Sequence, residues 1–183
     1  MNNITVLYFG SFNPFHIGHA TIAKFVAELP WVDELCFVLS PKNPLKESNC
    51  LQDATMRWND LQRVVEKLQK ETPIKISATD IEFNLQPPLY TYNTLERLKE
   101  LFPDKKFALL MGGDNIAIIE KWYKGLEIVE KYPVLVYPRK GFDTEALCKK
   151  YGAIFVDAPQ IDVSSTQIRN LENEGKDASH LRY

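Results

Sequence analysis

The sequence predicts an α/β fold: a doubly wound parallel sheet of five or six strands with helices on both faces. Short apolar runs alternate with segments of helical periodicity along the 183 residues, which is typical of parallel strands joined by helices. The apolar runs lack the polar alternation of half-exposed strands, so we expect both faces of the sheet to be covered. This pattern is Rossmann-like. Because no repeat, low-complexity tract or linker divides the chain, we expect residues 1–183 to form one domain.

The expected elements follow one another as alternating strands and helices. The first strand is the continuous apolar run at 4–9, and a helix at 17–29 follows it. The core face of that helix is expected to hold Ala20, Ala23, Val26 and Ala27. The other expected strands cover residues 34–39, 74–78, 107–111, 134–137 and 153–156. The other expected helices are one around 54–68, whose apolar residues step by three and four, one at 94–102 and one starting near Ser165.

Composition and charge argue against several classes of protein. The formal net charge is −2, so we expect no nucleic-acid partner. The three cysteines form no CxxC pair and are odd in number, which indicates neither a disulfide framework nor a zinc site and fits a reducing cytoplasm. The first three residues carry no basic group, so a signal peptide is not expected. Residues 2–23 lack charged side chains, but Asn, Pro and His interrupt them, so we expect no membrane span.

The segment GSFNPFHIGH at 10–19 carries the strongest functional signal. It follows the first expected strand and opens the first expected helix, which is where ligands bind at the carboxyl ends of parallel strands. Gly10 lets the backbone approach a ligand closely, and the first N–H groups of the helix favour an anion. His16 and His19 are spaced to share one helical face. These features indicate a phosphate-binding site with two histidines.

Two alternative roles for the histidines stay open at this point. One histidine could be structural and the other a surface residue, with Asn13 as a helix cap. A zinc site is the second alternative, although a third ligand is not evident. The absence of GxxxxGK[ST], GxGxxG, GxSxG and HExxH gives no support to Walker-type ATPases, nicotinamide-dependent dehydrogenases, serine hydrolases or zinc proteases.

The sequence HIGH at 16–19 matches the motif (T/H)xGH, so the chain resembles the HxGH nucleotidyltransferase superfamily. Further motifs occur in the order found in the nicotinate mononucleotide adenylyltransferase family. They are YTYNTL at 90–95, GGDN at 112–115, Trp122-Tyr123, Pro138-Arg139 and VSSTQIR at 163–169. Phosphopantetheine adenylyltransferase looks similar in the first motif but is not expected to have the middle ones. The resemblance therefore covers nearly the whole chain.

The resemblance implies an activity and a set of binding residues. The enzyme would join nicotinate mononucleotide to the AMP part of ATP, giving deamido-NAD and pyrophosphate in NAD biosynthesis. The residues expected at ATP are Gly10, Ser11, Phe12, His16, His19, Lys46, Asp114, Ser165, Thr166 and Arg169, with His16 and His19 as the catalytic pair. The residues expected at the mononucleotide are Asn13, Thr91, Trp122, Tyr123 and Arg139. Mg²⁺ is expected as a cofactor held mainly by ATP, with no metal ligands from the protein.

Several of these residues are also consistent with a purely structural role. Asn93 begins a capping-box pattern, and we expect it mainly to cap a helix. Asp114 is consistent with a helix cap and equally with a residue that bonds ribose hydroxyls. Trp122 is consistent with core packing and also with stacking on the pyridine ring of the substrate. Arg139 and Arg169 are also consistent with ordinary surface arginines.

The chain departs from the family pattern at three places. The family typically has Pro-His-Lys where this chain has Leu45 before Lys46, which puts the contact of that histidine in doubt. Phe9 stands where a second glycine is common, and Asn13 stands where Asp is common. Neither of the last two changes removes an expected phosphate contact.

The implied reaction needs no general base, because the attacking 5′-phosphate is already an anion. Catalysis would come from alignment and from donors that stabilise the phosphoryl oxygens and the leaving pyrophosphate. Nearby phosphates would favour protonated histidines. Two alternatives stay open: another acceptor, such as nicotinamide mononucleotide or pantetheine phosphate, and a non-catalytic nucleotide-binding module. The sequence is compatible with a homo-oligomer and does not determine the oligomeric state.

Overall fold

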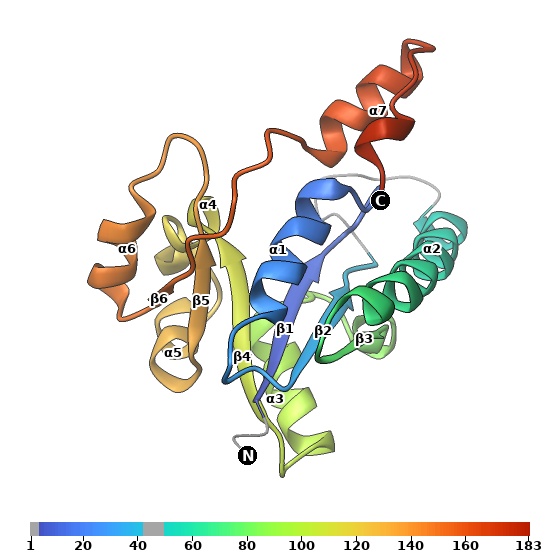
Figure 1. Cartoon of the computed structure of the whole chain (residues 1–183). Helices are drawn as coiled ribbons and strands as arrows, with labels where there is room; N and C mark the ends of the chain where they lie inside the picture. The colour runs from blue at the N-terminus through green and yellow to red at the C-terminus, as the bar shows by residue number, and fades with distance from the viewer. Residues whose placement is uncertain (1–3, 42–49) are drawn as a thin grey trace.

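The computed structural model describes residues 4–41 and 50–183. Six parallel strands form one sheet in the order β3-β2-β1-β4-β5-β6, which confirms the expected fold class (Figure 1). The strands are β1 (Ile4–Gly10), β2 (Glu34–Leu39), β3 (Lys75–Thr79), β4 (Lys106–Gly112), β5 (Val134–Tyr137) and β6 (Ile154–Phe155). Each lies within two residues of its expected position.

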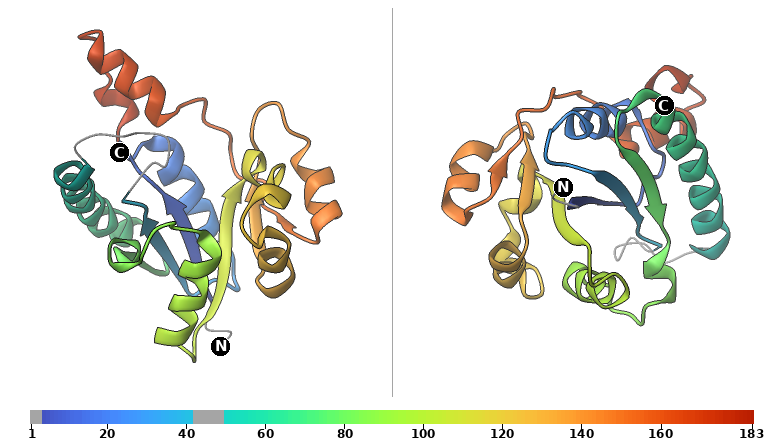
Figure 2. Two further views of the ribbon diagram at one scale, coloured as in Figure 1. Left: turned by 180° about the vertical axis from the view of Figure 1, so that it is seen from behind. Right: turned by 60° about the horizontal axis from the view of Figure 1, so that its bottom comes forward.

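Helices cover both faces of this sheet (Figure 2). One face is covered by α1 (Ile17–Ala27) and α2 (Cys50–Glu71). The other face is covered by α3 (Thr91–Leu101), α4 (Gly113–Ile116), α5 (Gly125–Lys131) and α6 (Thr144–Tyr151). Three 3₁₀ turns occur within the described residues: η1 (Ile81–Asn84), η2 (Ile119–Lys121) and η3 (Ser179–Leu181). The last helix, α7 (Ser165–Asn173), lies beyond the carboxyl ends of the strands, near the start of α1 (Figure 1).

The sheet separates the two larger apolar clusters of the described residues, and a third, small cluster contains Ile168 of α7. Val6 and Phe37 pack on the α1 and α2 side, whereas their neighbours Leu7 and Val38 pack on the α3 and α5 side. All four side chains are buried. Alternate residues of a strand point to opposite faces, so a strand buried on both faces needs apolar residues throughout. This arrangement explains why the sequence shows continuous apolar runs.

The helices differ from the expectation in two respects. Helix α3 begins at Thr91, three residues earlier than expected, and Tyr90 occupies its N-cap position without a side-chain hydrogen bond. Asn93 therefore lies inside the first turn, and its expected role as a cap is wrong. Helices α4, α5 and α6 were missed; α4 and α5 have only four and seven residues. Helix α6 did carry recognisable signals, since the Asp143 side chain accepts from the Ala146 N–H at its start and Gly152 ends it with φ 68°.

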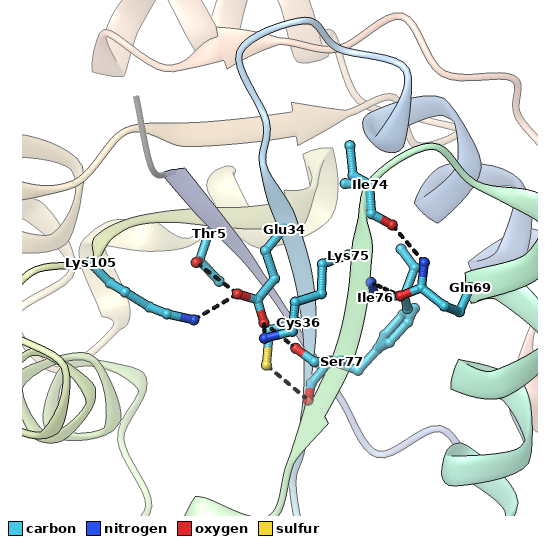
Figure 3. Close-up of polar contacts among 10 residues, drawn as sticks. Thr5, Glu34, Cys36, Gln69, Ile74, Lys75, Ile76, Ser77 and Lys105 are labelled. Atoms are coloured by element: carbon cyan, nitrogen blue, oxygen red, sulfur yellow. Dashed lines mark hydrogen bonds and ion pairs between the residues drawn. The ribbon is translucent and has the colours of Figure 1, made fainter. Parts of the chain in front are cut away.

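A buried carboxylate joins three segments at the amino ends of the strands, away from the carboxyl edge (Figure 3). Glu34 accepts from Lys105 Nζ and Ser77 Oγ, each at 2.6 Å, and pairs with Lys75 Nζ at 3.2 Å. Burial raises the pKa of Glu34, but the hydrogen bonds from Lys105, Ser77 and Lys75 outweigh it, so the pKa lies below its usual value. Glu34 thus holds β2 against β3 and against the segment that enters β4.

The sheet opens at its carboxyl edge between β1 and β4. Pairing of β1 with β4 ends at Tyr8 and Leu110, whereas β1 stays paired with β2 as far as Gly10 and β4 stays paired with β5 as far as Gly112. The chain order reverses at this point, and such reversals form crevices that bind ligands in doubly wound sheets.

Among the described helices, none has the length and apolar character needed to cross a membrane.

Candidate active site

Two cavities lie at the opening between β1 and β4. The first has a volume of about 470 Å³ and lies between the start of α1, the end of β5 and the segment that leads into α7. The second has a volume of about 380 Å³ and lies between the end of β1, η1, the start of α3 and η2. Both are large enough for parts of a nucleotide-sized ligand. The opening is therefore suited to two substrates held side by side.

His16 and His19 line the first cavity as a stacked pair. Their ring centroids are 3.7 Å apart and the rings are inclined by 24°. His16 has extended backbone and precedes α1 as its N-cap, whereas His19 lies within the first turn. The backbone N–H of His16 donates to Nδ1 of His19 at 3.3 Å. When His19 is neutral, its proton is therefore on Nε2, which leaves Nε2–H as a donor.

The packing around this pair leaves little room for a side chain at Gly18. A Cβ atom at Gly18 would lie 3.1 Å from the His16 ring and 3.1 Å from Cγ1 of Val163. Val163 belongs to the segment before α7, which closes over the first cavity. A glycine at this position thus lets the two sides of the cavity come together on the histidine.

The surrounding side chains keep both histidines neutral. Burial, followed by the charge of Arg139, lowers the pKa of His16 to about 4. Burial, His16 and Arg139 hold the pKa of His19 well below its ordinary value. Three aromatic rings surround His19 with centroids 5.1–6.0 Å away, those of Tyr8, Phe12 and Phe15. Protonation of these histidines beside bound phosphates stays a prediction, because the lowered pKa values are those of the protein without nucleotide.

Two helix N-termini converge on the first cavity. In α1 the first helical hydrogen bond runs from Ala20 N–H to the His16 carbonyl, so the N–H groups before Ala20 have no helical partner. In α7 the Ser164 side chain accepts from Gln167 N–H at 3.1 Å, and both residues line the cavity. Helix N-termini favour anions through their N–H groups and dipoles. The cavity is thus suited to a polyanion such as a triphosphate.

The predicted residues of α7 bind the turn that precedes His16. Ser165 Oγ donates to the Pro14 carbonyl at 2.9 Å, and Arg169 donates to the Asn13 carbonyl. Arg169 also donates to Thr166 Oγ1 at 3.1 Å. These contacts hold α7 against the 10–19 segment. The expected ATP contacts of Ser165, Thr166 and Arg169 stay predictions, as does the contact expected of the Asn13 side chain.

Asp114 and Arg139 form an ion pair on the wall of the first cavity, with Oδ1 and Nε 3.5 Å apart. Both of these atoms are buried and neither has a hydrogen-bond partner within the described residues. The pair places Arg139, which is expected at the mononucleotide, beside residues expected at ATP. Conversely Gly10 and Ser11, which are expected at ATP, line the second cavity. Which substrate each of these residues contacts stays a prediction.

The second cavity contains two of the residues expected at the mononucleotide. Thr91 is the first residue of α3, so its N–H lies at a helix N-terminus, and Trp122 follows η2 with a partly buried ring. Tyr123 is exposed and stacks on Tyr90 with centroids 4.7 Å apart. The ring of Phe12 is buried in the core and lines neither cavity, so the expected contact of Phe12 with ATP stays a prediction.

Sequence reasoning missed several residues of the two cavities. Tyr8 and Tyr137 line both cavities, and Glu82 lines the second, where its buried carboxylate accepts from Thr94 Oγ1 at 2.9 Å. In the sequence both tyrosines belong to apolar strand runs. Each lies two positions before a residue that the motifs single out, Gly10 or Arg139, and this proximity to a strand end was the available signal.

A buried arginine of α2, Arg57, binds the backbone at the ends of two strands. It is buried and donates to the carbonyl oxygens of Ser11, Ser40 and Pro41 at 2.7, 3.0 and 2.8 Å. These bonds hold the ends of β1 and β2 beside the second cavity. Lys46, expected at the triphosphate, lies outside the described residues.

The protein's own donors do not suggest a metal centre. Within residues 4–41 and 50–183, there is no group of three or more His, Cys, Asp or Glu side chains arranged to hold a metal ion. Asp114, a carboxylate on the wall of the first cavity, is already paired with Arg139. Mg²⁺ held mainly by ATP stays a prediction.

Comparison with known sequences gives the family. The sequence profile of the Cytidylyltransferase-like family matches residues 7–171. The chain is 43% identical over 177 residues to the probable nicotinate-nucleotide adenylyltransferase of Flavobacterium johnsoniae, with 96% of this chain and 89% of that protein covered. The chain belongs to the nicotinate-nucleotide adenylyltransferase family. A second member, the probable nicotinate-nucleotide adenylyltransferase of Porphyromonas gingivalis, is 39% identical, with 98% of this chain and 88% of that protein covered.

Solved structures of family members share the fold. The nicotinic acid mononucleotide adenylyltransferase of Plasmodium falciparum, complexed with NaAD, superposes with a TM-score of 0.79 at 23% identity, covering 97% of this chain and 87% of that one. A putative nicotinate-nucleotide adenylyltransferase of Vibrio parahaemolyticus superposes with a TM-score of 0.67 at 23% identity, covering 98% of this chain and 86% of that one. The similarity extends over almost the whole chain.

Proposed function

We propose that this enzyme transfers the adenylyl group of ATP to the 5′-phosphate of nicotinate mononucleotide, giving deamido-NAD and pyrophosphate, a step of NAD synthesis in the cytoplasm. The observation that carries the proposal is the pair of adjoining cavities at the opening between β1 and β4. The first, lined by the two histidines and reached by two helix N-termini, is suited to ATP. The second, with Trp122 and the start of α3, is suited to the mononucleotide.

The geometry supports catalysis by alignment and charge stabilisation. The acceptor phosphate attacks the α-phosphorus of ATP, a new P–O bond forms, and pyrophosphate leaves with the electrons of the broken bond. Neutral His19 offers Nε2–H to phosphoryl oxygens, and the α1 N–H groups and Arg139 stabilise the negative charge. No covalent intermediate with the protein is needed. Mg²⁺, bound mainly by triphosphate oxygens, would neutralise part of the pyrophosphate charge.

The carboxylate of the acceptor is matched by the start of α3. Thr91 lines the second cavity and carries a hydroxyl and a first-turn N–H, and the helix dipole favours negative charge there. A carboxylate accepts from every donor, whereas a carboxamide would turn its NH₂ group toward one of them. Nicotinate mononucleotide is therefore the acceptor that this cavity fits best.

Acceptor-dependent release of pyrophosphate from ATP tests the proposal. Nicotinate mononucleotide, nicotinamide mononucleotide and pantetheine phosphate would be compared in the presence of Mg²⁺, and His180→Ala would serve as a control for the two site histidines because His180 is exposed in η3. We expect rapid release with nicotinate mononucleotide only. Faster pyrophosphate release with another acceptor would identify that acceptor as the substrate. ATP binding without any pyrophosphate release would indicate a nucleotide-binding module.

A further inference from the structure

Two tyrosines stand at the boundary between the cavities. Tyr8 and Tyr137 are the residues common to both linings. Tyr8 lies on β1 and Tyr137 on β5, with β4 between these strands, and their rings meet on the α1 side of the sheet. The ring centroids are 6.1 Å apart, and the Tyr8 hydroxyl donates to the Tyr137 hydroxyl oxygen at 3.5 Å. Both side chains are buried.

The boundary is where the reacting atoms have to meet. If ATP occupies one cavity and the acceptor the other, the attacking oxygen and the α-phosphorus must come within about 3–3.5 Å of each other. That contact is possible only where the cavities adjoin, and Tyr8 and Tyr137 line both cavities. We propose that the Tyr137 hydroxyl donates a hydrogen bond to the phosphoryl group during its transfer, and that Tyr8 is a positioning residue for Tyr137. This inference rests on the proposed function and adds two residues to its mechanism.

The hydrogen bond between the tyrosines is compatible with these two roles. With Tyr8 as the donor to the Tyr137 oxygen, the proton of Tyr137 is available for a phosphoryl oxygen. Burial, followed by the neighbouring Tyr137, raises the pKa of Tyr8 well above its ordinary value, so Tyr8 stays a donor at neutral pH. The guanidinium of Arg139 lies 5.3 Å from the centre of the Tyr137 ring and adds positive charge beside it.

The proposed step leaves the tyrosines unchanged. The acceptor oxygen forms its bond to the α-phosphorus while the bond to the pyrophosphate oxygen breaks, and the electron pair leaves with pyrophosphate. Tyr137 keeps its proton and stabilises the charge that develops on the phosphoryl oxygen. Removal of its hydroxyl should therefore affect the transition state more than either bound substrate.

Removal of single hydroxyl groups tests the proposal. Tyr137→Phe, Tyr8→Phe and the double variant would be compared with Tyr132→Phe, whose hydroxyl bonds Glu96 on the opposite face of the sheet. Single-turnover formation of deamido-NAD, both KM values and thermal midpoints would be measured. We expect Tyr137→Phe to lower kcat roughly 10–100-fold with both KM values within about twofold. Tyr8→Phe should lower kcat less, and the double variant should equal Tyr137→Phe, because the hydroxyls act in series.

The rate of the reverse reaction gives a second measurement. A purely structural role of Tyr137 would not predict the change expected in this rate. Formation of ATP from deamido-NAD and pyrophosphate shares the transition state, so its rate should fall by the same factor in Tyr137→Phe. A wild-type kcat for Tyr137→Phe, a loss that appears in KM, or an equal loss in Tyr132→Phe would overturn the inference. Absence of acceptor-dependent pyrophosphate release in the wild-type enzyme would instead overturn the proposed function.

Discussion

The backbone N–H of His16 donates to Nδ1 of His19, and the two imidazole rings stack on each other with centroids 3.7 Å apart. This bond can form only when His19 Nδ1 carries no proton, so it selects the neutral form with the proton on Nε2. The motif HxGH therefore does more than place two donors near a phosphate. The backbone N–H of His16, the first residue of the motif, orients the ring of His19, the last residue.

The orientation of His19 leads to a prediction for conservative variants. The amide nitrogen of Gln can reach the place of Nε2, whereas that of Asn lies near the place of Nδ1. We expect His16→Ala and His19→Ala each to lower kcat roughly a hundredfold, or about 3 kcal/mol, with a small effect on the KM for ATP. His19→Gln should retain more activity than His19→Asn, and His180→Ala should behave as wild type. Equal activity of the Gln and Asn variants would contradict the assignment of the proton to Nε2.

The lowered pKa values of the histidines predict their titration. In the protein without nucleotide, the NMR signals of His16 should titrate at a pKa of about 4, because burial and Arg139 disfavour its charged form. Addition of ATP should raise this pKa, since phosphate charge favours the protonated ring. Both histidines should nevertheless be neutral at alkaline pH, so we expect kcat to stay constant from about pH 7 to about pH 9. A His16 pKa near the ordinary value of about 6.5 without nucleotide would show that the site is more hydrated than its packing indicates.

The second cavity predicts the substrate preference. Donors at the start of α3 should give nicotinate mononucleotide roughly a ten- to a hundredfold higher kcat/KM than its amide, as expected for one charge-assisted hydrogen bond. Trp122→Ala should weaken both acceptors alike, because the ring can stack on either, and should leave the KM for ATP nearly unchanged. Steady-state kinetics with both acceptors measures these effects. A raised KM for ATP with unchanged acceptor KM would assign Trp122 to the other substrate.

The Glu34 cluster predicts a pH-dependent stability. The pKa of Glu34 is lowered in the folded state, so its contribution is present above the unfolded pKa of about 4.3 and is lost as pH falls through the folded value. We expect Glu34→Gln to lower the free energy of unfolding at neutral pH by about 1–3 kcal/mol, because two lysines and Ser77 lose a charged partner. The difference from wild type should shrink in acid. Urea unfolding measures it, and Glu100→Gln, which affects an exposed pair with Arg97, should have little effect.

Most of the fold was accessible from the sequence because strands and helices have different apolar periods. The strands Glu34–Leu39 and Val134–Tyr137 agree with the apolar runs residue for residue. The start of α3 was misplaced because Asn93 resembles a cap, whereas the chain turns into the helix at Thr91. There Thr94 Oγ1 bonds the buried Glu82, a contact with η1 that no local pattern shows. Short helices such as α4 were missed because four residues carry too little periodicity.

The candidate site was accessible only in part. The spacing of His16, Gly18 and His19 indicated phosphate chemistry, and the motif order indicated the family. Neither feature showed that Arg57 is a buried structural residue or that Arg139 pairs with Asp114 on the wall of the first cavity. An arginine near a strand end has the same local sequence whether it binds carbonyl groups or a ligand. Its surroundings come from segments distant in the chain.

The sequence by itself determined the six strands, the helices α1, α2, α3 and α7 and the presence of a phosphate-binding motif, because these depend on residues that are close along the chain. Only the tertiary structure decided how the motifs are shared between two cavities. Tyr8 and Tyr137 are 129 residues apart, and their hydroxyls meet because β1, β4 and β5 lie side by side while β1 and β4 separate beyond Tyr8. That meeting depends on the order and register of the strands, which are set by packing over the whole sheet.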